Sequence, residues 1–68
     1  MLGDDHPDTL RSMNNLGMTL ANLGDLHDAR DLLEQAVTGR RRVLGDDHHD
    51  TLGSMNNLTT VRHELGEL

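Results

Sequence analysis

The chain has 68 residues, of which 34% are hydrophobic, none is aromatic and none is cysteine. Because there is no cysteine, disulfides and thiolate metal sites are excluded. Twelve acidic residues outnumber six basic ones and give a net charge of −6, so nucleic acid and anionic membrane surfaces are disfavoured as partners. No signal peptide is visible and no apolar run approaches the about 18 residues of a membrane span, so we expect a cytoplasmic protein.

The first predicted helix covers residues 7–23. Its apolar residues recur every three or four positions, as one face of an α-helix requires. The members of this face are Leu10, Met13, Leu16, Gly17, Leu20 and Leu23. Gly17 lies on the apolar face, where it would allow a second helix to approach closely. Asp5 is the expected N-cap, and Gly24 the expected stop.

The second predicted helix covers residues 26–43, with Asp25 as its N-cap and Gly45 as its stop. Its apolar face consists of Leu26, Ala29, Leu32, Leu33, Ala36, Val37 and Val43. The cations at 40–42 suit the negative end of the helix dipole, and we expect them to be solvated. Gly39 falls where an apolar residue would continue the face, so it is predicted to be a weak point, either a small cavity or a bend.

The third predicted helix covers residues 49–65, with Asp47 as its N-cap and Gly66 as its stop. Its apolar stripe is Leu52, Met55, Leu58, Val61 and Leu65. No segment has the alternating pattern of a strand, so the predicted fold class is all-α.

The chain contains an internal repeat. Residues 2–26 recur at 44–68 with an offset of 42 residues, and 16 of the 25 aligned pairs are identical. Self-similarity at a fixed period of this length is typical of repeat architectures. We therefore predict a single unit over residues 1–68, made of one repeat (1–43) and a half repeat (44–68).

These features resemble the tetratricopeptide (TPR) repeat. The resemblance rests on Leu16, Gly17, Leu20, Gly24, Leu26, Ala29, Leu33 and Ala36, which occupy the signature positions of a TPR helical hairpin in order. The 42-residue period and the loop VLGDDHHDTL resemble the kinesin light chain class. The resemblance implies a TPR-type helical hairpin plus one further helix, about 1.5 repeats of an α-solenoid. It also implies a non-catalytic scaffold for protein–protein interaction, without a cofactor.

The third helix departs from the TPR pattern at two positions. Thr59 is aligned with Gly17, and Arg62 is aligned with Leu20. In the family these two positions pack against the second helix of the same repeat. The substitutions therefore predict a partly polar end face.

Paired asparagines stand in the middle of two predicted helices, although asparagine is a poor helix former. In the family the first helix of each repeat lines a groove, and an amide side chain can both donate to and accept from a peptide backbone. The resemblance thus suggests a site for a peptide or partner protein formed by Asn14, Asn15, Asn56, Asn57, Arg11 and Met18. The alternative is that the asparagines satisfy backbone groups of neighbouring helices or loops.

The acidic loops before the first and third helices carry histidines. His6, His48, His49 and Asp46 are weak candidates for divalent metal ligands. The aspartates already serve as predicted helix caps, and no pair of histidines stands four residues apart on one helix. Metal binding is therefore a minor alternative.

The third helix has no hairpin partner within the chain. We expect its stripe, formed by Leu52, Met55, Leu58, Val61 and Leu65, to be buried in a homo-oligomer. A symmetric dimer is favoured, with exchange of helices about the loop LGDDHHD as one route. The alternative is a structural, self-assembling fragment of a longer TPR array that has no ligand of its own.

Overall fold

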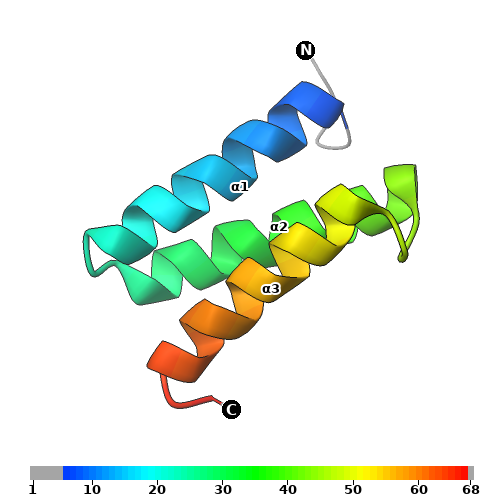
Figure 1. The fold of residues 1–68 in the computed structure, drawn as a ribbon. Coiled ribbons are helices and arrows are strands. Elements are labelled where there is room, and N and C mark those ends of the chain that lie inside the picture. Colours follow the sequence, from blue (N-terminus) through cyan, green and yellow to red (C-terminus); the bar gives the residue numbers. More distant parts are fainter. Residues whose placement is uncertain (1–5, 68) are drawn as a thin grey trace.

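The computed structural model describes residues 6–67, and within these residues the secondary structure consists of three α-helices. They are α1 (Pro7–Asn22), α2 (Leu26–Leu44) and α3 (His49–Glu64). The first two form an antiparallel hairpin, and α3 lies along α2 with a smaller contact to α1 (Figure 1). The arrangement is a slab whose Cα extents are 30 × 26 × 14 Å. The all-α prediction is confirmed.

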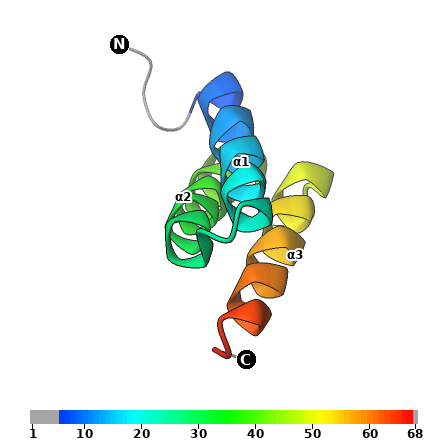
Figure 2. The same cartoon turned by 90° about the vertical axis from the view of Figure 1, so that its left-hand side faces the viewer.

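Each helix ends at or just before a glycine with positive φ. Gly24, Gly45 and Gly66 have φ values of 91°, 96° and 79°, a region in which a Cβ would be strained. Leu23 and Leu65 are the C-caps of α1 and α3, and Gly45 itself is the C-cap of α2. The predicted stops are therefore confirmed. Figure 2 shows the turn after α1, where the chain reverses direction into α2.

Two of the three predicted N-caps are wrong. The N-cap of α3 is His48, whose Nδ1 accepts a hydrogen bond from the Asp50 backbone N–H at 3.0 Å, so Asp47 lies one residue too early. The N-cap of α1 is His6, whose Nδ1 accepts from the Asp8 backbone N–H at 3.1 Å; Asp5 lies outside the described residues. Asp25 is the N-cap of α2, as predicted, although its side chain makes no capping hydrogen bond.

The core is aliphatic and contains much alanine. Its fully or almost fully buried hydrophobic residues are Leu10, Ala29, Leu33, Ala36, Val37 and Val61. Gly17 lies directly over Leu33, since a Cβ at Gly17 would stand 2.9 Å from Leu33 Cγ and 3.4 Å from the Ala29 carbonyl oxygen. The predicted close approach of two helices at Gly17 is thus confirmed.

Gly39 is not a cavity, so that part of the prediction is wrong. The helix continues through it, and the side chain of Leu10 occupies the space that a Cβ would need. Leu10 is only 1% exposed. Gly39 is therefore the second contact at which α1 and α2 interlock. Here the glycine is on α2 and the leucine on α1, whereas at the first contact Gly17 is on α1 and Leu33 is on α2.

The apolar stripe predicted for α3 is divided between two faces. Val61 is fully buried, and Leu58 and Leu65 pack against the same core cluster. They therefore have partners within their own chain, which corrects the expectation that all five residues await a second copy. Only Leu52 and Met55 remain open, with 50% and 37% of their surfaces exposed.

Within residues 6–67, no helix combines the length and the apolar content that a membrane crossing requires.

Candidate functional site

A polar network joins all three helices. Asn14 Oδ1 on α1 accepts hydrogen bonds from Ser54 Oγ at 2.8 Å and from Asn57 Nδ2 at 3.3 Å, both on α3. Arg40 on α2 donates through Nη1 to Ser54 Oγ at 2.8 Å and to the Asp50 carbonyl oxygen at 3.0 Å. Ser54 thus both donates and accepts, and it links the amide of α1 to the guanidinium of α2.

Arg40 and Ser54 are buried, with exposed fractions of 8% and 0%. This corrects the expectation that Arg40 is a solvated cation at the end of α2. A buried polar group is costly unless it is hydrogen-bonded, because it has lost its contacts with water. The network meets this requirement only when α3 docks in one register, so it fixes how α3 sits against the hairpin.

The predicted peptide-binding residues lie in different surroundings. Asn14 and Asn57 meet inside the polar network, as the structural alternative proposed. Met18 is partly buried against the core cluster. Asn15 and Arg11 are exposed on α1, and Asn56 is exposed on α3.

Sequence reasoning missed Ser54 and Arg40, the two residues that complete the network. Ser54 belongs to the repeated motif SMNNL, and its counterpart in the first copy is Ser12. A serine kept in both copies among apolar positions is the one sequence signal that could have indicated it. Arg40 carries no such signal, because it stands in a run of three arginines.

The outward side of α3 forms a shallow groove of about 460 Å³. We name this surface the outer face of α3, and it is lined by His49, Leu52, Gly53, Met55, Asn56 and Thr59. Arg62 continues the same helical face one turn beyond Thr59. This surface contains both large hydrophobic side chains of α3 that remain exposed.

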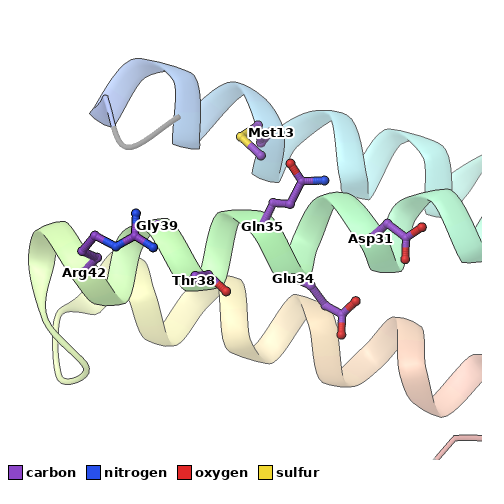
Figure 3. Close-up of a pocket in the computed structure, with 7 residues that line it drawn as sticks. All are labelled: Met13, Asp31, Glu34, Gln35, Thr38, Gly39 and Arg42. Atoms are coloured by element: carbon purple, nitrogen blue, oxygen red, sulfur yellow. The ribbon is translucent and has the colours of Figure 1, made fainter. Parts of the chain in front are cut away.

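A second groove, of about 500 Å³, lies between α1 and the outer side of α2 (Figure 3). Met13 lines it from α1, and the other residues come from α2: Asp31, Glu34, Gln35, Thr38, Gly39 and Arg42. Its charges are mixed along its length, with carboxylates towards the start of α2 and a guanidinium towards the end. It therefore carries no clear preference for a ligand of one charge.

The C-terminal end of α3 is tied to α2 by charge. Glu67 contacts Arg30 Nη1 at 2.5 Å and Arg62 Nε at 3.3 Å. The hydrogen bond that Arg30 donates to Glu67 raises the pKa of the Arg30 guanidinium, and a second hydrogen bond that it donates to Asp31 raises it further. Arg30 also pairs with Asp31 at 3.2 Å and with Glu34 at 4.0 Å, so carboxylates balance the guanidinium groups at this end of α3.

The metal candidates are not assembled into a site. No group of three potential ligands stands close enough to hold a metal ion within the described part of the chain. The Nδ1 atoms of His6 and His48 already accept helix-capping hydrogen bonds. Asp46 pairs with Arg41 at 3.0 Å, and His49 lies beside the Asp50 carboxylate at 3.7 Å.

The helical hairpin, the glycine over Leu33 and the third helix stacked on the second are the arrangement of a repeat array. The family profile described as tetratricopeptide repeat matches residues 9–50. The chain belongs to the tetratricopeptide repeat family. The searches of curated proteins and of solved structures returned no match. TPR units generally act as non-catalytic modules that bind other proteins.

Proposed function

We propose that this TPR unit is a non-catalytic protein-interaction module that binds an extended segment of a partner protein across α1 and α3. The observation that carries the proposal is the hydrogen bond from Asn57 Nδ2 to Asn14 Oδ1, which joins these two helices. Exposed side chains that can hydrogen-bond a peptide backbone, Asn15 and Arg11, stand next to this contact.

Asn14 and Asn15 have different roles in this proposal. Asn14 already accepts two hydrogen bonds within the fold, so its role is to position α3. Asn15 has an exposed amide that can donate to a carbonyl and accept from an N–H of an extended peptide. Arg11 lies one helical turn away from Asn15 and adds a cation for a carbonyl or an acidic side chain of the partner.

The test is a selection of extended peptides from a random-sequence display library, followed by titration of the selected peptides against variants. Asn15→Ala and Arg11→Ala are expected to weaken binding about tenfold each, because each removes hydrogen bonds to the ligand. Asn22→Ala, on the exposed last turn of α1, is the matched control. Unchanged affinity in both Asn15→Ala and Arg11→Ala would refute the proposal, provided that their helical circular dichroism is retained.

Self-association is the second candidate function. Its support is that α3 is joined to α2 by only the four residues between them and packs mainly on α2, through Leu58, Val61 and Leu65. A straightened hinge at residues 45–48 would let α3 make the same contacts on a second copy, giving a six-helix dimer. Sedimentation at micromolar concentration is expected to show the dimer, and a folded monomer would refute it.

We further place the chain in the kinesin light chain-like class and in the cytoplasm. The 42-residue offset and the loop VLGDDHHDTL support the class, and an acidic chain without cysteine is consistent with that location.

A further inference from the structure

A small cavity lies at the end of the molecule where α1 begins, α2 ends and α3 begins (Figure 1). Its volume is about 230 Å³, which is below the range of about 300–1,000 Å³ that is typical of sites for drug-sized ligands. It would therefore suit a small molecule. One part of its wall is apolar and is formed by Pro7, Leu10, Val43 and Leu44.

Arg40 lines this cavity and has hydrogen-bond donors to spare. Only 8% of its surface is exposed. Its Nη1 donates to Ser54 Oγ and to the Asp50 carbonyl oxygen, whereas Nη2 and Nε make no hydrogen bond to any residue in 6–67. No carboxylate in residues 6–67 forms an ion pair with Arg40 either. Because a buried cation without a counter-ion is costly, a carboxylate that reached Nη2 and Nε would be held by charge-assisted hydrogen bonds.

The cavity also contains negative charge that does not pair with Arg40. Asp8 of α1 and Asp50 of α3 line it. Within residues 6–67 the Asp8 carboxylate forms no ion pair, and the Asp50 carboxylate lies 3.7 Å from the ring of the exposed His49 and near no arginine. Arg11 is a further cation of the lining, so the two arginines balance the two carboxylates. A ligand that carries one charge only is therefore disfavoured, and a ligand that carries both is favoured.

We propose that this cavity binds a free amino acid with a small aliphatic side chain, as its zwitterion. The α-carboxylate accepts hydrogen bonds from Nη2 and Nε of Arg40, the α-ammonium lies beside the carboxylates of Asp8 and Asp50, and the side chain contacts the apolar wall. The ligand thus bridges charges that the three helices hold apart. This site is separate from the proposed interaction with a partner protein, because its ligand is a small molecule.

Titration of the ¹⁵N-labelled full chain with L-valine, followed by NMR, tests the proposal. We expect the Arg40 Nε–H resonance to shift. Isovalerate lacks the amine of valine and isobutylamine lacks its carboxylate, so each is expected to bind at least about tenfold more weakly. Equal affinities of L-valine and isovalerate would overturn the proposal. So would the absence of any shift up to about 0.1 M L-valine, where even a ligand with a Kd of about 1 mM would saturate the chain.

Variants of the chain supply the reciprocal test. Asp8→Asn and Asp50→Asn keep the shape of exposed residues, and Asp50→Asn also keeps the carbonyl group that holds Arg40. Each is expected to weaken L-valine binding at least about fivefold and to leave isovalerate binding unchanged or tighter, because only valine has an ammonium group. Asp28→Asn, in the first turn of α2 and outside the cavity lining, is the matched control and is expected to bind L-valine as the wild type does. Unchanged L-valine affinity in both Asp8→Asn and Asp50→Asn, at retained helicity, would refute the site.

Discussion

Two glycine-to-alanine substitutions, both inside helices, are expected to change stability in opposite directions. At Gly53 a new Cβ would have no atom within 4 Å, so the variant gains only the better helix propensity of alanine, about 1 kcal/mol. At Gly39 the same gain applies, but the new Cβ overlaps Leu10 Cδ2 and stands 3.2 Å and 3.3 Å from Leu10 Cδ1 and Cγ. Overpacking of a closed core costs about 1–3 kcal/mol, so Gly39→Ala is expected to destabilise by about 1 kcal/mol net.

Urea unfolding followed by circular dichroism at one protein concentration measures both variants, and the expected difference between them is about 2 kcal/mol. A double-mutant cycle isolates the contact itself. Leu10→Ala is expected to cost about 2–5 kcal/mol in the wild type and about 1 kcal/mol less in Gly39→Ala, because the added methyl group then fills part of the space left by the leucine. If Gly39→Ala stabilises as much as Gly53→Ala, and the cycle shows no coupling, the interlocking of Leu10 with Gly39 is refuted.

Three further substitutions test the polar contacts. Asn14→Ala is expected to destabilise by about 1–2 kcal/mol, because it leaves donors on α3 without an acceptor, whereas Asn15→Ala, its exposed neighbour, is expected to stay within about 0.5 kcal/mol of the wild type in chemical unfolding. His48→Ala is expected to lower stability by about 1 kcal/mol through loss of the N-cap of α3, and His48→Asn to restore it, since asparagine caps well; equal melting temperatures of the two variants would contradict the capping role. Thr51 is fully buried and its Oγ1 has no hydrogen-bond partner in residues 6–67. Thr51→Val, which keeps the shape, is therefore expected to raise the midpoint of urea unfolding, and a clear fall would show that the hydroxyl is satisfied.

The helices could be predicted from the sequence because their signals are local. Apolar residues every three or four positions and a glycine at each stop depend only on neighbouring residues, and they placed the helix ends within about one residue of those observed. The N-caps were less predictable, since several polar residues in each loop could fill the role. In α1 and α3 the N-cap is a histidine, His6 or His48, whose Nδ1 accepts a hydrogen bond from the backbone N–H two residues further on.

The contacts between helices were harder to predict because they join residues far apart in the sequence. A glycine on an apolar face predicts either a void or the insertion of a neighbour, and periodicity does not decide between them. Gly17 was expected to be a close contact and is one. Gly39 was expected to be a defect, but its partner, Leu10, lies 29 positions away and points into the space above it.

The paired asparagines show the same limit within the candidate site. Asn14 and Asn15 are chemically identical neighbours, yet one is held inside the polar network and the other faces solvent. About 100° of rotation around the helix separates them. Only the position of α3, which no local pattern gives, decides which of the two is available to a ligand.

The hydrogen bonds of Asn14 also give the repeat a polarity. Asn14 accepts from Ser54 and Asn57, whose counterparts in the first copy are Ser12 and Asn15, so each unit accepts from the unit that follows it. Asn56, the counterpart of Asn14, makes no side-chain hydrogen bond to any residue in 6–67. Its amide oxygen could therefore accept the same two hydrogen bonds from a further copy of the repeat. Duplication of a 42-residue segment in register would reproduce the same junction each time. The unit is thus suited to genetic lengthening in tandem, with every added copy oriented the same way.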